Sequence, residues 1–249
     1  MEYIASLSYG KDSMYMLEVI HEHGLPLDKI VTVDVWATPT IPAELPPVVE
    51  FKKYADEQIK KRYGFVVEHL RAKRSFEEQF YTVKKCGKRK GSIYGFPFQK
   101  LAWCNDRLKT SVLKQFKAKR YKQYIGYAID EKQPKRQQKI KQYLNGKIFE
   151  NQYYPLVDFE ITEQQAYCWC QQNGLLSPTY KNGNLRGGCW FCQNQRESEL
   201  RNLRKQYPEY WNILLKWDKD SPYPFKVGGT TVQDLEEKFD MEDRQERLF

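Results

Sequence analysis

Segments typical of β-strands alternate with amphipathic helical segments from the start of the chain, and this alternation constrains the fold more than any other feature. Residues 3–7, 30–35 and 65–70 are rich in strand-forming residues. Between them, residues 14–23 and 48–63 repeat apolar residues at helical spacing. Strands that alternate with helices of this length form βαβ units, whose parallel sheet is covered by helices on both faces. We therefore expect an α/β fold with a doubly wound, mainly parallel, Rossmann-like sheet.

The rest of the chain adds further elements to this pattern. Residues 103–119 predict another helix, and residues 124–127 predict a fourth strand. Thr162 and Gln165 have the spacing of a capping box, which predicts the start of a helix there. Residues 197–216 predict an aromatic helix in a C-terminal helical extension.

Length and composition are those of a folded protein. The 249 residues suffice for an α/β domain with an extension, and 41% hydrophobic with 15% aromatic residues excludes a disordered chain. We expect residues 1–160 to form a nucleotide-binding α/β domain. Residues 161–249 are expected to form a cysteine-containing loop and helical region packed on it. The sequence contains no run of about 20 apolar residues and no basic segment before an apolar one, so we expect a cytoplasmic protein without a membrane partner.

The net charge of +9 is concentrated in basic runs. Lysine and arginine gather at residues 84–90, 114–122 and 132–141. Such runs are either a solvated surface or a binding surface for a polyanion such as nucleic acid. Aromatic residues interleaved with the charges keep both interpretations open. They are Tyr94, Phe96, Phe98, Tyr121 and Tyr124.

The segment Ser8–Ser13 joins the first expected strand to the first expected helix. A strand followed by a glycine-containing turn and a helix start directs backbone N–H groups and the positive end of the helix dipole at one point, where anions bind. Gly10 permits close approach of a phosphate, Lys11 adds positive charge, and the two serines offer hydroxyl groups. Asp12 can orient a magnesium-bound water or cap the helix. The alternative is an ordinary turn in which Asp12 or Ser13 only caps. The spacing is shorter than that of a Walker A motif, which disfavours a P-loop NTPase.

Five motifs, in the same order along the chain, resemble those of the phosphoadenosine-phosphosulfate reductase family and the wider adenine-nucleotide α-hydrolases, the N-type ATP pyrophosphatases. The resemblance spans residues 3 to about 195, and Tyr9 replaces the first glycine of the family's S-G-G-K-D-S loop. The matching segments are residues 8–13, Trp103-Cys104 with Leu108-Lys109, residues 126–131, Tyr154-Pro155-Leu156 with Asp158, and the G-C-W-F-C segment at residues 188–192.

The resemblance implies a set of nucleotide contacts. ATP and Mg²⁺ are the expected ligands, and Lys11, Asp12 and Ser13 are the expected catalytic residues. The expected nucleotide-binding residues are Ser8, Gly10, Lys11, Asp12, Ser13, Asp34 and Gly126.

Two departures distinguish the chain from reductases that release sulfite. No cysteine follows Cys192, and Ala128 stands where the resemblance leads us to expect an arginine. Loss of a charge-assisted bond to an oxyanion costs roughly 1.5–3 kcal/mol, which disfavours a phosphosulfate substrate. The resemblance therefore favours a sulfurtransferase-like branch, in which ATP adenylates a substrate, releasing pyrophosphate, for sulfur transfer.

The partners implied by that branch are an adenine nucleotide, a nucleic acid (tRNA or DNA) as acceptor, and a sulfur donor protein. Two other functions stay open. One is a phosphoadenosine-phosphosulfate reductase-like oxidoreductase, and the other is a non-catalytic nucleic-acid-binding module.

Six cysteines without a secretion signal point to metal binding, redox chemistry or packing instead of disulfides. Cys189 and Cys192 form a C-x-x-C pair, whose spacing lets both sulfurs reach one metal. The resemblance adds Cys104 as a distant ligand and Cys170 as the fourth, with Cys168 as a competitor. Cys86 is a remoter candidate. A 4Fe-4S cluster, zinc, and unligated or redox thiols all remain open.

Overall fold

The structure is a computed structural model that describes residues 1–97, 102–116, 120–181 and 187–246. Its internal contacts divide the chain into two compact units, each assembled from three segments. The boundary expected after residue 160 lies inside the first of them, and the packing of residues 161–249 as one extension stays a prediction. Unit 1 comprises Met1–Asp34, Pro46–Leu70 and Val112–Gly187; unit 2 comprises Val35–Leu45, Arg71–Ser111 and Gly188–Phe249.

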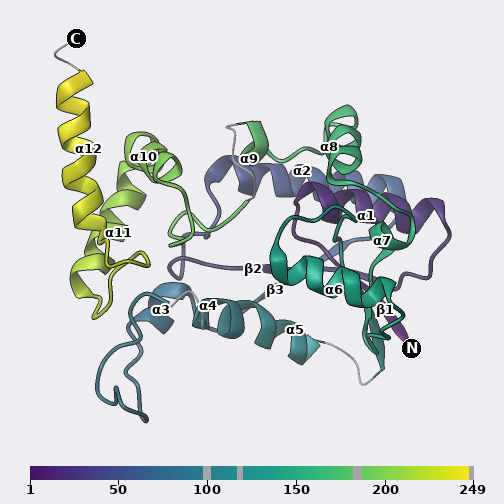
Figure 1. The fold of residues 1–249 in the computed structure, drawn as a ribbon, viewed down its shortest axis with the longest axis horizontal. Helices are drawn as coiled ribbons and strands as arrows, with labels where there is room; N and C mark the ends of the chain where they lie inside the picture. Colours follow the sequence, from purple (N-terminus) through teal and green to yellow (C-terminus); the bar gives the residue numbers. More distant parts are fainter. Residues whose placement is uncertain (98–101, 117–119, 182–186, 247–249) are drawn as a thin grey trace. The chain divides into compact units, whose positions relative to one another are not determined.

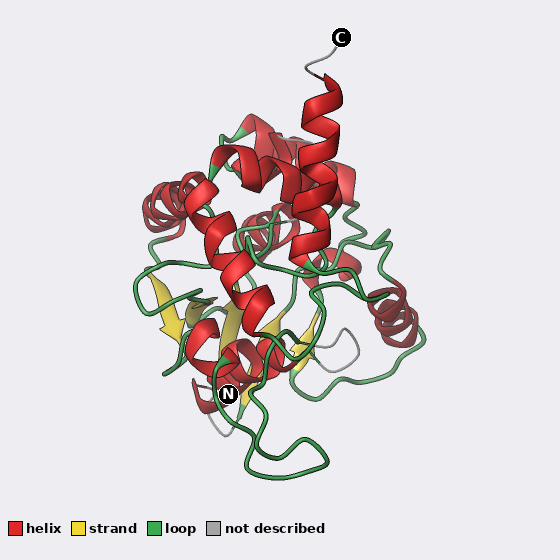
Figure 2. Ribbon diagram, turned by 90° about the vertical axis from the view of Figure 1, so that its left-hand side faces the viewer, coloured by secondary structure: helices red, strands yellow, loops and turns green. Residues whose placement is uncertain are grey.

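Unit 1 is built on a five-stranded sheet (yellow in Figure 2). The strand order is β3-β2-β1-β4-β5, so β1 is central and the chain adds strands first on one side of it and then on the other. Strand β1 pairs in parallel with β2 and β4, and β4 pairs in parallel with β5. The strands are β1 (Glu2–Ser6), β2 (Lys29–Asp34), β3 (Val67–Arg71), β4 (Tyr121–Tyr124) and β5 (Gln152–Tyr153).

Helices lie on both faces of this sheet (Figure 1), which confirms the expected doubly wound α/β fold. Helices α1 and α2 lie on one side, and α5 and α6 lie on the other, as right-handed crossovers in opposite directions from β1 require. Helix α8 packs along α1. The helices are α1 (Lys11–Glu22), α2 (Pro46–Tyr63), α5 (Ser111–Phe116), α6 (Pro134–Leu144), α7 (Pro155–Asp158), α8 (Glu163–Gln172) and α9 (Pro178–Lys181).

The main core of unit 1 is largely aliphatic. Helix α1 buries one face, including Met14, Leu17 and Ile20, against strands that contribute Ala5 and Ile30. Full burial of a leucine, isoleucine or methionine side chain contributes about 1.5–3 kcal/mol, so this one face fixes α1 on the sheet. The start of α1 is thereby held next to the end of β1.

Unit 2 is helical and has an aromatic core of its own. Phe76, Phe80, Phe191 and Trp217 pack ring against ring, and Trp190 stacks on Trp217 with centroids 5.6 Å apart. Of the C-terminal aromatic residues, Trp211 and Trp217 belong to this buried core, and Tyr207 and Tyr210 pack against it. The helices are α3 (Phe76–Phe80), α4 (Trp103–Asn105), η1 (a π-helix, Asp106–Thr110), α10 (Glu197–Gln206), α11 (Pro208–Asp220) and α12 (Val232–Glu246).

Several boundaries differ from those expected. The helix predicted at residues 103–119 is interrupted by a π-helical turn, and residues 117–119 lie outside the described part. The helix predicted at residues 197–216 is two helices, because Pro208 lacks an N–H and begins a new one. Strand β4 ends before Ile125, earlier than expected. The capping box at Thr162 is confirmed.

Helix α3 was not expected, although the sequence contains its signal. Ser75 caps α3, and Glu78 bonds back to the Ser75 N–H at 2.7 Å, forming a capping box.

Among the helices in the described residues, none combines the length and apolar character needed to cross a membrane.

Candidate nucleotide-binding site

The Ser8–Ser13 segment lies where the strand order of the sheet reverses. Strands β2 and β3 follow on one side of β1, whereas β4 and β5 lie on the other. In open α/β sheets, ligands bind in the crevice at the carboxyl ends of the strands at such a switch point. The segment follows β1, and Gly126 follows the neighbouring β4, so both lie at this edge of the sheet.

Helix α1 begins without a side-chain cap. Gly10 is the N-cap residue, with φ −80° and ψ 156°. The first-turn N–H groups of a helix have no acceptor within the helix, so a glycine cap leaves them for another acceptor. Ser13 instead holds the loop together: its hydroxyl accepts the Ser8 N–H at 3.1 Å and donates to the Gly10 carbonyl at 3.0 Å. The start of α1 thus has the form of an anion-binding turn.

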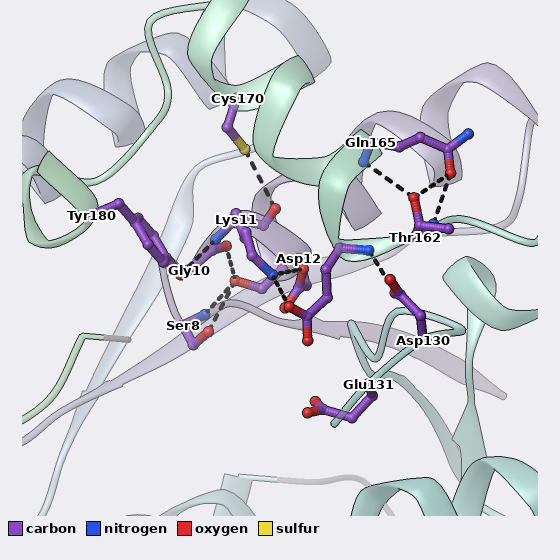
Figure 3. A network of polar contacts seen from close by, with 12 residues as sticks. Ser8, Gly10, Lys11, Asp12, Asp130, Glu131, Thr162, Gln165, Cys170 and Tyr180 are labelled. Carbon is purple, nitrogen blue, oxygen red and sulfur yellow. Dashed lines mark hydrogen bonds and ion pairs between the residues drawn. The ribbon is translucent and has the colours of Figure 1, made fainter. Parts of the chain in front are cut away.

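Lys11 is paired with carboxylates beside this turn (Figure 3). Its ammonium lies 2.7 Å from Asp12 and 3.5 Å from Glu163, the first residue of α8. Burial acts to lower the pKa of Lys11, but the hydrogen bond and charge of Asp12, together with Glu163, raise it above its usual value. Lys11 is therefore a cation at neutral pH.

The pKa of Asp12 is also raised, but in Asp12 this disfavours the charged form. Burial raises the pKa of Asp12, Lys11 counteracts this, and the neighbouring carboxylates Glu163 and Glu131 raise it further. The result is a carboxyl group whose ionised form is less favoured than in water. A cation brought to this point would relieve both the burial and the repulsion.

Tyr180 covers the amide end of α1 (Figure 3). Its hydroxyl accepts the N–H of Lys11 at 3.3 Å, and a β-carbon added at Gly10 would lie 3.3 Å from the same oxygen. On the other side of the turn, the Cys170 thiol donates to the Lys11 carbonyl at 3.4 Å. Lys11 is thus held through its N–H, its carbonyl and its ammonium.

Gly126 makes the closest backbone approach to the turn. A β-carbon at this position would lie 2.9 Å from the Asp12 carbonyl oxygen and 3.0 Å from the Ser13 α-carbon. These contacts are shorter than side chains tolerate, and the atoms met are backbone atoms. The absence of a side chain at Gly126 therefore allows the segment after β4 to lie against α1.

Tyr9, which replaces the family's glycine, anchors the loop to the rest of unit 1. Its φ is 55°, a conformation that favours glycine, and its ring is buried. The hydroxyl donates to Asp56 at 2.6 Å and lies 3.3 Å from His69. The Lys52 ammonium lies 5.0 Å from the ring centroid. These contacts from α2 and β3 offset the strain of the backbone.

Asp34, expected among the nucleotide-binding residues, belongs to the same cluster. It forms an ion pair with Lys52 and lies 2.7 Å from Nδ1 of His69. Burial would raise the pKa of Asp34, but Lys52 and His69 lower it below its usual value. Asp34 is the last residue of β2 and so lies at the carboxyl end of that strand. Its role in nucleotide binding stays a prediction.

The structure brings together most of the predicted nucleotide residues, and it adds two that sequence reasoning missed. Glu163 was detectable in principle, because the Thr162 capping box fixes where α8 begins. Tyr180 carries no sequence signal, since it belongs to a single helical turn far from the loop. The residues brought together are Ser8, Gly10, Lys11, Asp12, Ser13 and Gly126.

Three of the predicted metal ligands belong to unit 2. Cys104, in α4, and Cys189 each interact electrostatically with Cys192, and Lys109 lies near enough to act on both. Burial raises the pKa of the Cys189 thiol to about 12, and it also raises that of Cys104. The Cys192 N–H donates to the Cys189 carbonyl at 3.0 Å, which closes the C-x-x-C turn.

The other cysteine candidates lie elsewhere. Cys170 is fully buried in unit 1 against Lys11, and burial raises its pKa to about 12. Cys168 is half-buried on the same helix, and Cys86 is exposed in unit 2. Their part in metal binding stays a prediction.

The donor set at Cys104, Cys189 and Cys192 suits a soft metal. Thiolates are the ligands of iron-sulfur clusters and of many zinc sites, and a metal would stabilise the ionised sulfurs that burial now disfavours. In the arrangement described, no group of three or more cysteine, histidine or carboxylate residues is already drawn together as a metal site. The set therefore fits by chemistry, and binding would draw the sulfurs closer.

Comparison with known proteins gives distant relatives. No model of a protein family matches the chain. Two archaeal proteins of Methanocaldococcus jannaschii match it: uncharacterized protein MJ0973 is 27% identical over 177 residues, and uncharacterized protein MJ0066 is 23% identical over 175 residues. The matches cover 68% and 65% of this chain, but only 38% and 31% of the two relatives.

A solved structure similar to the chain is the U34-tRNA thiolase NcsA from Methanococcus maripaludis with its 4Fe-4S cluster. The TM-score is 0.42 and the identity is 15%, over 88% of this chain and 71% of that one. The chain spans less than half the length of the curated relatives it matches.

Proposed function

We propose that the chain is an ATP-binding enzyme that adenylates a substrate, releasing pyrophosphate, in preparation for sulfur transfer to a nucleic acid. The observation that carries the proposal is the position of the Ser8–Ser13 turn. It joins the central strand to an uncapped helix N-terminus, at the switch point of a doubly wound sheet. A helix start at that edge favours a phosphate-bearing ligand.

The charges beside the turn suit ATP carried with Mg²⁺. Lys11 would neutralise a phosphate oxygen, and Asp12 would face the magnesium of the bound nucleotide. A divalent cation beside Asp12 would also offset the two effects that raise the pKa of Asp12, burial first and then the charges of Glu163 and Glu131. Catalysis of adenylation needs little covalent chemistry from the protein, because positioning and charge stabilisation of the leaving pyrophosphate supply most of the effect.

Sulfite formation from a phosphosulfate nucleotide is less well supported. The position at which the reductases carry an arginine is Ala128, whose side chain is 1% exposed and offers no donor to an oxyanion. A buried methyl group cannot replace a bidentate guanidinium.

The cysteines of unit 2 are the proposed metal ligands. Cys104, Cys189 and Cys192 would hold a 4Fe-4S cluster, or zinc in the structural alternative. Cys170, the fourth ligand expected from the sequence, donates its thiol to the Lys11 carbonyl in unit 1 and is left out of the proposed set. An iron-sulfur cluster with one iron free of protein ligands would supply a place for sulfide. The proposed role of the chain's own residues is to hold that metal and to keep it within a largely buried aromatic core.

The test is to incubate the full chain with Mg²⁺, sodium sulfide and ATP labelled in either the α- or the γ-phosphate, with and without bulk transfer RNA or duplex DNA. We expect pyrophosphate from the adenylation step and an equal amount of AMP from displacement of the adenylate by sulfide, both dependent on one of the nucleic acids and lost in Lys11→Ala. Production of ADP and phosphate, or of neither pair of products, would contradict the proposal. Sulfite released from a phosphosulfate nucleotide would favour the reductase alternative.

A further inference from the structure

A short basic hairpin in unit 2 lies outside the proposed nucleotide site. Val83 and Ile93 form an antiparallel bridge, and two backbone hydrogen bonds of Lys84, at 2.9 and 3.0 Å, continue the pairing. Gly87 and Gly91 adopt φ values of 81° and 89°, which the tight reversal requires. We call residues 83–93 the basic hairpin.

The basic hairpin concentrates positive charge without acidic neighbours in sequence. Five of the nine residues between its bridged ends are lysine or arginine, and none is acidic. Lys85, Lys88 and Lys90 are exposed, and within the described part of the chain they form no ion pair with a carboxylate. Their charge is therefore available to an external partner.

Aromatic rings brace the base of the hairpin. Lys84 and Arg89 lie 4.7 and 4.5 Å from the Tyr223 ring centroid, and the Lys84 ammonium donates to the Tyr223 hydroxyl at 3.0 Å. A second ring, that of Tyr94, holds Arg107 in the same way. The Arg107 guanidinium lies 4.7 Å from the Tyr94 ring centroid and donates to the Tyr94 hydroxyl at 2.6 Å. A ring face holds a cation in place without cancelling its charge, as a carboxylate would.

We propose that the basic hairpin grips the phosphate backbone of a folded RNA. This inference rests on the proposed function, in which a nucleic acid is the acceptor. An acceptor atom on a base must leave the base stack to reach the bound ATP, and RNA loops already present unstacked bases. An anionic membrane surface is disfavoured, because the exposed turn from residue 85 to residue 91 carries no large apolar side chain to insert.

The test uses the full chain without ATP and measures anisotropy of a fluorescein-labelled RNA stem-loop that has an unpaired loop. Comparison ligands are a DNA duplex of equal length and vesicles that contain phosphatidylserine. The variant K85A/K88A/K90A removes three charges from the hairpin. Its control, K53A/K60A/K61A, removes three exposed charges from α2.

We expect the hairpin variant to bind the RNA at least about tenfold more weakly. The slope of log affinity against log salt concentration should be smaller in magnitude by about 2 to 3, because each phosphate contact contributes roughly 0.7–0.9 to it. The control variant should change affinity by less than about twofold, since its lysines would not meet the backbone. Equal weakening in both variants, tighter binding of the duplex than of the RNA, or hairpin-dependent binding of vesicles alone would each overturn the proposal.

Cys86 offers a second measurement, because it is the exposed cysteine within the hairpin. Saturating RNA should slow its alkylation by N-ethylmaleimide, read by peptide mass spectrometry, while Cys168 in unit 1 serves as the reference. Unchanged alkylation of Cys86 would overturn the inference. Assays of AMP formation and of RNA binding in wild type and Lys11→Ala separate the two proposals. Absence of AMP formation in both proteins would remove the adenylation step, whereas RNA binding through the hairpin would stand by itself.

Discussion

The hydroxyl of Tyr180 accepts the main-chain N–H of Lys11 at 3.3 Å. This N–H belongs to the first turn of α1, where the proposed phosphate tail of the nucleotide would bind. Tyr180 therefore occupies the acceptor position that a phosphate oxygen would take. Nucleotide binding through this amide requires the phenol to give up its hydrogen bond.

Tyr180→Phe should consequently bind ATP more tightly. A neutral hydrogen bond contributes about 1 kcal/mol, so removal of the competing acceptor is expected to lower the Kd for MgATP by roughly fivefold. Isothermal titration calorimetry with the full chain measures this directly. Weaker binding in Tyr180→Phe would mean that the phenol contacts the nucleotide instead of competing with it.

Gly126→Ala should destabilise unit 1 and impair nucleotide binding together. The added methyl would lie 2.9 Å from the Asp12 carbonyl oxygen, so the backbone must move, at an expected cost of about 1–3 kcal/mol in the free energy of unfolding. Urea denaturation measures the stability. Gly188→Ala is the matched control, because nothing lies within 4 Å of its added β-carbon. Equal stability of the two variants would refute the close approach.

Metal content should depend on the cysteines of unit 2. We expect Cys104→Ala, Cys189→Ala and Cys192→Ala each to lose most of the iron or zinc bound by anaerobically purified protein, whereas Cys168→Ala retains it. Cys170→Ala should also retain it, because this thiol already donates to the Lys11 carbonyl in unit 1. Elemental analysis with a visible spectrum distinguishes cluster from zinc, and metal loss in Cys170→Ala would establish it as the fourth ligand.

Stability should fall at alkaline pH in a manner that depends on Cys170. Its pKa is raised from the usual 9.0 to about 12 in the folded protein, so between these values the unfolded chain has released a proton that the folded chain retains. Unfolding is then favoured as pH rises, by up to about 1.4 kcal/mol per pH unit. The stability advantage of wild type over Cys170→Ala should shrink from pH 9 upward. A constant difference would contradict a buried thiol.

Much of the sheet was predictable, because local periodicity determines whether a segment forms a strand or a helix. The first three strands and the first two helices lie close to their expected residues. Strand β4 shifts toward the N-terminus because the segment that contains Gly126 leaves the sheet to lie against α1. The cause is the close approach of Gly126 to Asp12 and Ser13, which are more than a hundred positions away in the sequence. A local sequence pattern does not encode such a contact.

The phosphate-binding turn of the site was predictable from the sequence, whereas the side chains that contact this turn were not. The sequence of residues 8–13 indicates a phosphate-binding turn, whereas the partners of Tyr9 come from α2 and β3. No rule of spacing connects Tyr9 to Asp56 and His69, because only the packing of the folded unit brings them together. The same holds for Tyr180, which meets Lys11 from a single turn of helix.

The interleaved division of the chain has a practical consequence for dissection of the protein. Each unit draws on three stretches that alternate with those of the other, so no single cut yields both halves whole. A fragment that ends near residue 187 keeps every stretch of the sheet-bearing half and deprives its neighbour of the last helices and of both C-x-x-C sulfurs. In a truncated chain, loss of metal therefore cannot be told apart from loss of folding. Point substitutions are the sound way to assign roles to these two halves.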